Sequence, residues 1–406
     1  MTNEGKCVEI YAYHHYKGMR NLFKSFKAEI MPTPEQREII LRTIGVCRFV
    51  YNLYVGVNID RHEQGKPFMS GMTFSVWLNN EYLPANPDKA WIKEVSSKAV
   101  KKAIMNAETA YRHFFKGQGH FPRFKKKGKS DPSMYFVRNG AKQPIDCERH
   151  RIKIPTLGWV RLKEYGYLPV NGSIKSGTVS IRAGRFFVSV LEEVPEAEKQ
   201  TPETDGIGVD LGIKAFATVS DERVFENVNH TKKARRLKKR LRREQRKLSR
   251  KYESLKKRNL KGDATRQNIH KQTLTVQRIY YRLDCIRTDF INKSIAELAK
   301  TKPSYIAIED LNVSGMMKNR HLSQAVSEQK FSEFRRKLTA KSAESGMELR
   351  IVDRFYPSSK TCHCCGRVKR SLKLSERVYS CECGYTAGRD YNAALNLRDT
   401  ERYKIA

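Results

Sequence analysis

The chain of 406 residues carries 79 lysines and arginines against 43 aspartates and glutamates, a formal net charge of +36. A surplus of this size repels itself unless a polyanion neutralises it, so the composition indicates a nucleic-acid partner. It argues against a small-molecule metabolic enzyme and a secreted disulfide scaffold. Hydrophobic residues make up 39% and aromatic residues 10% of the chain, enough to build cores, which argues against disorder.

The cysteines and the N-terminus bear on the compartment. The first residues contain no apolar segment of the signal-peptide kind, and no apolar run approaches the roughly 20 residues of a membrane helix. Five of the nine cysteines fall between Cys362 and Cys383. We therefore expect a cytoplasmic protein without a membrane partner, in which the cluster binds metal and the other thiols are reduced.

The N-terminal half changes character twice along the chain. Residues 22–30 alternate apolar and polar side chains as a strand does. Thr33 and Pro34 then mark a helix start, and helical spacing continues to about residue 116. Short β-rich runs follow, so we predict a small β-barrel interrupted by a helical module. We assign residues 1–20 to a weakly structured leader, 21–32 and 117–200 to the barrel, and 33–116 to a helical recognition insert.

The C-terminal half begins after a polar linker that contains two prolines, at 195–205. Helix–strand units are predicted at 304–309 and 349–352, and the continuous apolar run at 305–308 is typical of a buried parallel strand. Between them and the linker lies a long basic stretch with helical spacing. Strands that alternate with helices predict an α/β domain. We assign residues 201–360 and 386–406 to this domain, 231–300 to its long basic helices, and 361–385 to an inserted zinc ribbon.

Three acids stand in contexts that could bring them together. Asp210 lies between glycines in a strand–turn–strand pattern, Glu309 ends a buried strand, and Asp390 opens the last helix. Hard divalent ions take oxygen ligands, so these carboxylates could hold two Mg²⁺ ions roughly 3.5–4 Å apart and support phosphodiester hydrolysis. We interpret the neighbouring Asp310 and Asp353 as capping or solvated charges.

The glycines around Asp210 admit two further interpretations. Without side chains they would let a large ligand approach the backbone. The segment GVDLGIK also resembles the phosphate loop of the actin-like and chaperone ATPases. That alternative requires a second phosphate loop and an adenosine-binding glycine motif, and the sequence shows neither.

The cysteine cluster has the pattern CHCCG followed by CECG. Two cysteine pairs, each followed by a glycine that permits a tight turn, predict a zinc ribbon with one structural Zn²⁺ per chain. The second pair is one residue shorter than the common spacing, so His363 or Cys364 could substitute at one position. Our predicted ligands are Cys362, Cys365, Cys381 and Cys383.

Two basic segments are candidates for nucleic-acid contact. Residues 231–258 carry a narrow apolar stripe on an otherwise basic helix, for which a solvated face is the alternative. Residues 111–129 interleave aromatic and basic side chains, so rings could stack on bases while cations hold phosphates. The alternative there is a hydrophobic staple. The candidate contacts are Phe121, Arg123, Phe124, Lys125, Lys126, Lys127, Lys238, Lys239, Arg242, Arg243 and Arg246.

Four segments resemble the RuvC-type nuclease signatures of the transposon-encoded TnpB family, which is related to the miniature type V CRISPR effectors. They are GVDLGIKAF, YIAIEDLNVSGMMKN, VDRFYPSSKTCHCCG and GRDYNAALNL. Upstream, SFKAEIMPTPEQREIILRTIGVCRFVYN, GHFPRFKKKGK and IPTLGWVRL resemble the N-terminal half of the same family. The last signature has Gly388 where the family usually has a first acid, and Asp390 supplies the second, catalytic acid.

The resemblance implies a fold and an activity. The fold would be a wedge-like N-terminal β-barrel with a helical insert, followed by a RuvC/RNase H-like α/β nuclease with an inserted zinc ribbon. The activity would be RNA-guided cleavage of double-stranded DNA, with Asp210, Glu309 and Asp390 holding Mg²⁺. A guide RNA would select the target, and the protein would read a short adjacent duplex motif. By analogy with the family, Arg48, Tyr51 and Asn52 become groove contacts.

Three alternatives remain. A CRISPR-associated effector would use the same chemistry. A nuclease-silent DNA-binding regulator would lose at least one acid, so the intact set argues against it. A transposase would join strands as well as cut them. From the family we expect a prokaryotic protein that acts at the nucleoid. The oligomeric state stays open between monomer and dimer, and we favour the monomer.

Overall fold

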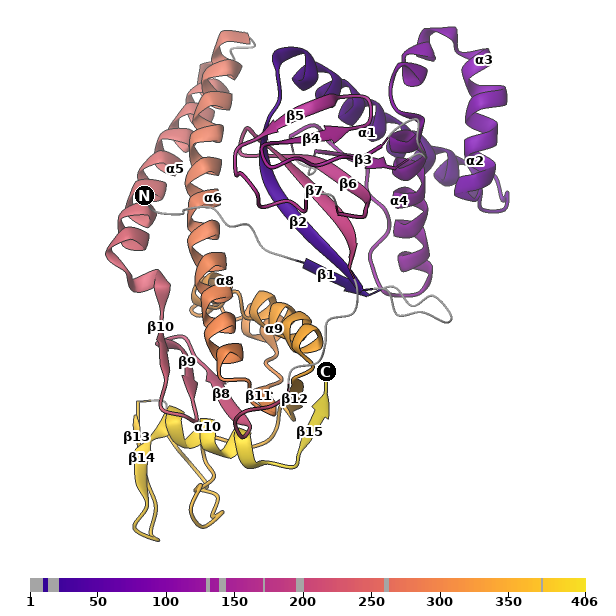
Figure 1. Cartoon of the computed structure of the whole chain (residues 1–406). Coiled ribbons are helices and arrows are strands. Elements are labelled where there is room, and N and C mark those ends of the chain that lie inside the picture. The colour runs from indigo at the N-terminus through magenta and orange to yellow at the C-terminus, as the bar shows by residue number, and fades with distance from the viewer. Residues whose placement is uncertain are drawn as a thin grey trace. The chain divides into compact units, whose positions relative to one another are not determined.

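The computed structural model describes residues 10–13, 22–128, 132–138, 144–170, 172–194, 201–258, 263–373 and 375–406 (Figure 1). The chain divides into two compact units. One contains the described residues from 11 to 194, and the other contains those from 201 to 406 together with Ile10. We call them the N-terminal unit and the C-terminal unit.

The N-terminal unit is built on a seven-stranded sheet in the order β3-β6-β7-β2-β5-β4, with β1 paired to β2. One core cluster includes Phe136 of β3 and Ile152 of β4, so both end strands share a single core. Among the described residues no pairing joins those two strands. The strands are β1 (Ile10–Tyr13), β2 (Leu22–Met31), β3 (Ser133–Val137), β4 (Arg151–Ile154), β5 (Gly158–Leu162), β6 (Ile174–Arg182) and β7 (Arg185–Val194).

Strand β1 lies inside the segment that we expected to be a weakly structured leader. Its backbone pairs with β2, and this pairing gives residues 10–13 a place in the sheet. The remainder of that segment, 1–9 and 14–20, lies outside the described residues. The leader assignment is therefore wrong for β1.

The helices of the N-terminal unit lie between β2 and β3. Thr33 caps α1 as predicted: its hydroxyl accepts from the Gln36 N–H at 3.3 Å, and the Gln36 side chain accepts from the Thr33 N–H at 3.0 Å. Val50 of α1 and Ala107 of α4 share one apolar cluster. The helices are α1 (Pro34–Glu63), α2 (Gly71–Trp77), α3 (Leu83–Ala85) and α4 (Ser97–Phe115), with a π-helical turn at Leu78–Tyr82 and a 3-10 helix at Pro87–Glu94.

Helix α1 is long and apolar enough to cross a membrane by length and composition, although we expected no segment of this kind. This is weak evidence, because half of its most apolar window is buried inside the protein, as in a core helix. Ile40, Val50 and Tyr54 are fully buried along it.

The C-terminal unit is built on a six-stranded sheet in the order β10-β9-β8-β11-β12-β15. Strands β8, β11 and β12 run parallel, while β9 runs antiparallel to β8, β10 to β9, and β15 to β12. The strands predicted at 304–309 and 349–352 are confirmed as β11 and β12. The bounds are β8 (Ile207–Leu211), β9 (Ala215–Val219), β10 (Val224–Glu226), β11 (Tyr305–Glu309), β12 (Glu348–Val352) and β15 (Tyr403–Ile405).

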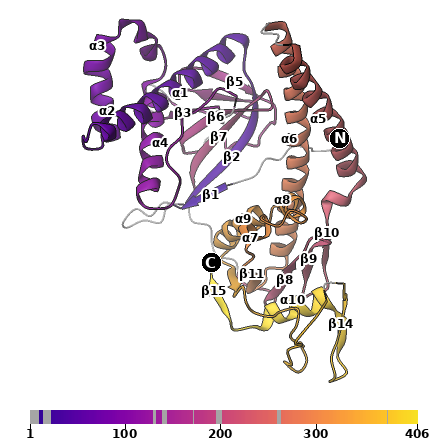
Figure 2. The ribbon, with the colours of Figure 1, turned by 180° about the vertical axis from the view of Figure 1, so that it is seen from behind.

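Helices cover both faces of this sheet (Figures 1 and 2). Val209, Ile308 and Ile351 face one core, which contains residues of α6, α8 and α9. The side chains that alternate with these point to the other face of the sheet, where Ala307 and Val352 contact Leu397 of α10. The helices are α5 (Lys232–Arg258), α6 (Asp263–Lys300), α7 (Val313–Met316), α8 (Ser323–Gln329), α9 (Phe331–Ser345) and α10 (Arg389–Asp399), with a 3-10 turn at Val228–His230 and a small hairpin of β13 (Val378–Ser380) and β14 (Thr386–Gly388).

Two glycines, Gly208 in β8 and Gly206 just before this strand, determine how closely neighbouring segments approach it. A Cβ on Gly208 would lie 2.0 Å from the carbonyl oxygen of Ala394 in α10. A Cβ on Gly206 would lie 2.0 Å from the ring of Tyr305. The space beside these glycines is therefore filled by the protein itself. This corrects our expectation that they leave the backbone open to a large ligand.

We expect Gly208→Ala to lower the free energy of unfolding by about 1–3 kcal/mol, the usual cost of overpacking, because α10 must move away from β8. The measurement is chemical denaturation. Gly45→Ala in α1 is the control, because its Cβ would meet nothing within 4 Å and the substitution favours helix. Equal stability of the two variants would contradict the close contact.

Candidate functional site

Two carboxylates come from neighbouring parallel strands. Gly208 of β8 lies opposite Ala307 of β11, and Val209 lies opposite Ile308. One step further along both strands, Asp210 and Glu309 stand side by side. Because side chains alternate along a strand, both carboxylates lie on the face that carries α10.

The third carboxylate, Asp390, comes from the first turn of α10. It precedes Ala394 by about 6 Å along the helix, and Ala394 lies against Gly208. Asp210 lies roughly 6.6 Å beyond Gly208 along its strand. Helix and strand thus carry the two carboxylates to the same place.

The three predicted acids lie close enough together for Asp390 and Glu309 to influence the protonation of Asp210. Burial, together with the negative charges of Asp390 and Glu309, raises the pKa of the half-buried Asp210 to about 7. Burial, together with the charge of Asp310, also raises the pKa of Glu309. All three groups offer only oxygen atoms, which is the ligand type that Mg²⁺ takes.

Two arginines beside these acids were not found from the sequence. Arg389 donates from Nε and Nη2 to Asp390 Oδ1 at 3.2 and 3.1 Å, and its charge opposes the raised pKa of Asp210. Arg377 Nη1 lies 3.9 Å from Asp390 Oδ2. The backbone N–H of Arg389 donates to the carbonyl of Arg377 at 2.8 Å, and this bond brings the second arginine near.

Of the two acids that we interpreted as capping or solvated charges, Asp353 caps a turn, whereas Asp310 forms ion pairs with two arginines. Asp310 accepts from Arg335 at 2.5 Å and from Arg354 at 2.8 Å. Although burial opposes the change, these arginines hold the pKa of Asp310 below its ordinary value. Asp353 caps a turn by accepting from the Phe355 N–H at 2.8 Å. Neither acid joins the three-carboxylate site.

We expect Asp210→Asn to raise the melting temperature of the Mg²⁺-free protein, more at pH 8 than at pH 5. An aspartate has a pKa of about 4 in the unfolded chain and Asp210 has one of about 7 when folded, so the folded state loses stability as pH rises between these values. The amide removes this loss. Thermal unfolding with zinc retained measures it, with the exposed Asp205→Asn as control. A lower melting temperature at pH 8 would contradict the cluster.

The four predicted zinc ligands lie together. Cys362 Sγ is 3.7 Å from Cys383 Sγ, and Cys365 Sγ is 3.6 Å from Cys381 Sγ, with all four sulfurs within 4.8 Å of one another. A tetrahedral ion with Zn–S bonds of about 2.3 Å separates its sulfurs by roughly 3.8 Å, so this cluster fits zinc. The glycines after each pair, Gly366 and Gly384, adopt positive φ angles of 72° and 88°.

The two possible substitutes lie elsewhere. Cys364 is exposed and outside the cluster. The Nδ1 atom of His363 lies 3.7 Å from Asp399 Oδ2. Two asparagines of α10 fasten this region to the helix: Asn392 donates to the Thr361 carbonyl at 2.8 Å and accepts from the His363 N–H at 3.1 Å, while Asn396 donates to the same carbonyl at 2.7 Å. We did not assign these asparagines a role from the sequence.

Purified protein should contain about one zinc ion per chain. Cys365→Ser should lower the zinc content at least twofold because it removes one of four thiolates, whereas Cys364→Ser should keep it. Elemental analysis of the folded proteins measures this. A folded wild-type protein without zinc, or equal loss in both variants, would show that the four sulfurs are not the ligands.

Part of the predicted nucleic-acid surface of the N-terminal unit serves the protein's own packing. Asn52 Nδ2 donates to the Lys125 carbonyl at 3.0 Å, and Asn52 Oδ1 accepts from the Lys125 N–H at 2.7 Å. Lys125 Nζ lies 4.0 Å from the ring centre of Tyr51, which is only 6% exposed. We expected Tyr51 and Asn52 to contact a groove and Lys125 to hold phosphate, but these intramolecular contacts use all three to hold the aromatic–basic segment on α1.

The rest of that segment faces outward. Phe121 is 46% and Phe124 is 50% exposed. Phe121 also contacts the edges of Tyr111 and Phe114, with ring centres 5.6 and 5.2 Å away, so it packs and remains accessible at once. Arg123, Lys126 and Lys127 are exposed, and Arg48 is half-buried.

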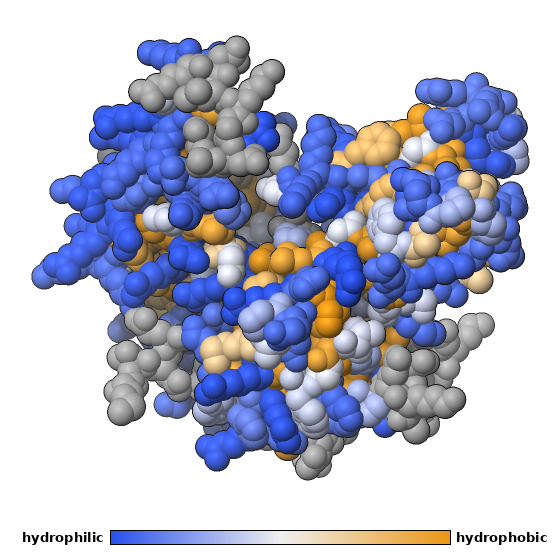
Figure 3. Space-filling model, turned by 90° about the horizontal axis from the view of Figure 1, so that it is seen from above, coloured by the Kyte–Doolittle hydropathy of each residue, from blue (hydrophilic) through white to orange (hydrophobic). Residues whose placement is uncertain are grey.

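Helix α5 exposes most of its predicted cations. Figure 3 shows a mostly hydrophilic surface over the helix pair α5 and α6. Lys239, Arg242, Arg243 and Arg246 are exposed, and a shallow groove lies along Arg242, Arg246 and Arg250. Lys238 is the exception, because its ammonium lies 2.5 Å from Glu328 Oε2 and its side chain is 22% exposed. This ion pair corrects the expectation that Lys238 faces a ligand.

Known proteins resemble the chain over most of its length. It is 32% identical to the "Putative RNA-guided DNA endonuclease InsQ" of Escherichia coli (strain K12), over 92% of this chain and 91% of that protein. The chain belongs to the TnpB family. A "Putative RNA-guided DNA endonuclease" of Streptomyces pristinaespiralis is also 32% identical, over 93% of this chain and 89% of that protein.

Family models and a solved structure agree with this membership. Residues 188–320 match a family described as "Probable transposase" (OrfB_IS605), residues 19–67 its "Helix-turn-helix domain", and residues 331–397 the "Cas12f1-like, TNB domain". The structure of Cas12f1 with sgRNA and target DNA covers 95% of this chain and 100% of its own, with a TM-score of 0.60 at 12% identity. That likeness shows the shared fold.

Proposed function

We propose that this TnpB-family protein is an RNA-guided DNA endonuclease that cleaves double-stranded DNA by two-metal-ion hydrolysis. The observation that carries the proposal is the convergence of Asp210, Glu309 and Asp390 on one face of the sheet. The two relatives that match over nine tenths of the chain are named for this activity. Of the interpretations considered, this one uses the carboxylates, the basic surface and the cysteine cluster together.

The topology of the C-terminal unit supports a RuvC/RNase H-like nuclease domain. The sheet contains five successive neighbouring strands in the order β10, β9, β8, β11 and β12. Among these five, β9 runs antiparallel to the other four. This arrangement places two acids at the ends of adjacent parallel strands. For the N-terminal unit we propose a wedge-like barrel, because β3 and β4 share one core although they are the end strands.

Asp210, Glu309 and Asp390 would hold two Mg²⁺ ions, which activate the attacking water and stabilise the leaving oxygen when bound. The chain's own contribution is to place three carboxylates rigidly. Gly208 permits α10 to approach β8, and Arg389 neutralises part of the negative charge beside Asp390. The raised pKa of Asp210 means that this carboxyl gives up its proton when cations occupy the site.

The partners that we propose are a guide RNA and a double-stranded DNA target. The exposed cations of α5 and of residues 123–127 provide contacts to a phosphate backbone without sequence preference. Pairing between guide and target would then supply the sequence choice. The Cas12f1 structure with the same fold contains an sgRNA and target DNA.

The experiment begins with RNA that co-purifies with the protein expressed from its own locus. Sequencing should return one dominant species with defined ends, which then programs cleavage of a matching plasmid. Glu309→Gln should lower Mg²⁺-dependent cleavage at least a hundredfold and leave RNA binding intact. Asp310→Asn, which changes the adjacent acid, should retain cleavage within about tenfold, because Asp310 pairs with arginines outside the site.

Other outcomes would redirect the assignment. A smear of unrelated RNA, or none, would favour a DNA-binding regulator. Joined strands among the products would favour a transposase. Equal cleavage by the Glu309 and Asp310 variants would remove Glu309 from the site.

A further inference from the structure

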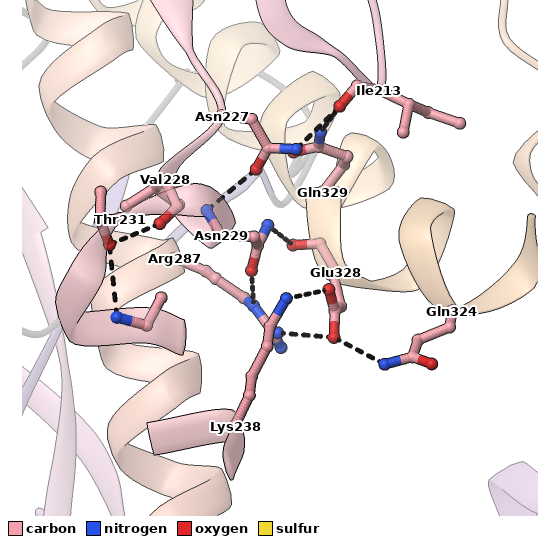
Figure 4. A network of polar contacts seen from close by, with 11 residues as sticks. Ile213, Asn227, Val228, Asn229, Thr231, Lys238, Arg287, Gln324, Glu328 and Gln329 are labelled. Atoms are coloured by element: carbon pink, nitrogen blue, oxygen red, sulfur yellow. Dashed lines mark hydrogen bonds and ion pairs between the residues drawn. The ribbon is translucent and has the colours of Figure 1, made fainter. Parts of the chain in front are cut away.

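A buried polar network adjoins the turn that follows Asp210 (Figure 4). The turn is closed by the Gly212 N–H, which donates to the Phe216 carbonyl at 3.0 Å. Gln329, at the end of α8 and 3% exposed, donates from Nε2 to the carbonyls of Gly212 and Ile213 at 3.3 and 3.0 Å. A side chain more than a hundred residues away thus holds two successive carbonyls of this turn.

A second amide holds the same turn from another direction. Asn227 Nδ2 donates to the Ile213 carbonyl at 2.7 Å, and Asn227 is 6% exposed. Its Oδ1 atom accepts from the Asn229 N–H at 2.9 Å. Because a buried carbonyl without a donor is costly, these two amides fix where the turn lies.

Glu328, the residue before Gln329, binds the basic helices. Its Oε2 atom lies 2.5 Å from Lys238 Nζ of α5, and its Oε1 atom lies 3.3 Å from Arg287 Nη2 of α6. Arg287 Nε also donates to Asn229 Oδ1 at 2.7 Å, and Asn229 Nδ2 donates to the Glu328 carbonyl at 3.1 Å. Consecutive residues of α8 therefore bind the turn on one side and both long helices on the other.

The corner between α8 and α9 is fastened to α6 as well. Lys330 adopts a left-handed backbone conformation with φ of 58°, and its ammonium donates to Asp284 Oδ1 at 2.8 Å and to Thr288 Oγ1 at 2.7 Å. These bonds hold the end of α8 in place. A movement of α6 relative to the sheet would therefore pull on Gln329 directly.

We propose that Glu328 and Gln329 are positioning residues that make the geometry of the carboxylate site depend on the placement of α5 and α6. The inference rests on the proposed function, since it assigns those carboxylates to DNA cleavage. Asp210 is two residues from the turn that Gln329 holds, and misplacement of a reacting group by about 1 Å can lower a rate a hundredfold. Nucleic acid bound to the exposed face of α5 would thus act on the site through Lys238 and Glu328.

The first test compares Gln329→Ala with Gln324→Ala, the same change on the same helix. Gln324 is exposed, and in the described part of the chain its amide donates to Glu328 Oε1 at 3.1 Å but not to the turn. With guide and target saturating, Gln329→Ala should lower the single-turnover cleavage rate at least tenfold and raise the Mg²⁺ concentration needed for half-maximal rate. RNA and target binding should change less than twofold. Gln324→Ala should match wild type in all three measurements.

The second test uses two lysines that carry the same charge. Lys238→Gln should lower the cleavage rate and raise the Mg²⁺ requirement while guide affinity and its salt dependence stay within twofold. Lys239→Gln should weaken guide or target binding and reduce the salt dependence, because this exposed cation faces solvent. Should Gln329→Ala not fold, Glu328→Gln serves in its place, since it keeps the shape of the side chain and removes the charge.

The outcomes distinguish a failure of the positioning role of Glu328 and Gln329 from a failure of the proposed DNA cleavage. An unchanged Mg²⁺ requirement in Gln329→Ala and Lys238→Gln would overturn the positioning role, whether or not stability fell. Loss of RNA binding by Lys238→Gln to the same extent as by Lys239→Gln would also overturn it. If the wild-type protein with its guide cut no DNA, the proposed function itself would fail, and these comparisons would not be reached.

Discussion

The candidate site depends on the contact of a helix backbone with a strand backbone. Because Gly208 has no side chain, the carbonyl of Ala394 can lie where a Cβ would be, and α10 packs directly on β8. One turn earlier, the same helix presents Asp390, and two residues later the same strand presents Asp210. Three mutually repelling carboxylates can share a space only if the backbones that carry them are held by packing, and this contact provides it.

The basic side chains fall into two groups, those exposed to solvent and those paired with acidic or aromatic side chains inside the fold. Lys239, Arg242 and Arg246 stand in solvent, where a phosphate backbone can reach them. Others act inside the fold: Lys238 pairs with Glu328, and Arg350 lies between the rings of Tyr305 and Tyr403, 3.4 and 4.4 Å from their centres. Net charge alone therefore overstates the nucleic-acid surface. The distinction requires knowing which cations have acidic or aromatic neighbours.

Local patterns in the sequence predicted the features that depend on neighbouring residues. Thr33 and Pro34 determine the start of α1, the apolar run at 304–309 determines a buried strand, and cysteine spacing identified the cluster. The roles of Tyr51, Asn52 and Lys238 were misjudged because their partners, Lys125 and Glu328, are distant in sequence. Gln329 and Arg377 carry no local signal at all, since only the folded chain brings Gln329 to the turn after Asp210 and Arg377 to Asp390.

The small cysteine module and the last acid belong to one mechanical body. Asn392 and Asn396, on the buried side of α10, hold the loop around Thr361, and β14 leads directly into the turn that carries Asp390. The module therefore cannot be treated as a removable insertion when a smaller version of this protein is designed. A shortened chain would need a new set of donors and acceptors for those two asparagines, or the helix would lose the support that aims its carboxylate.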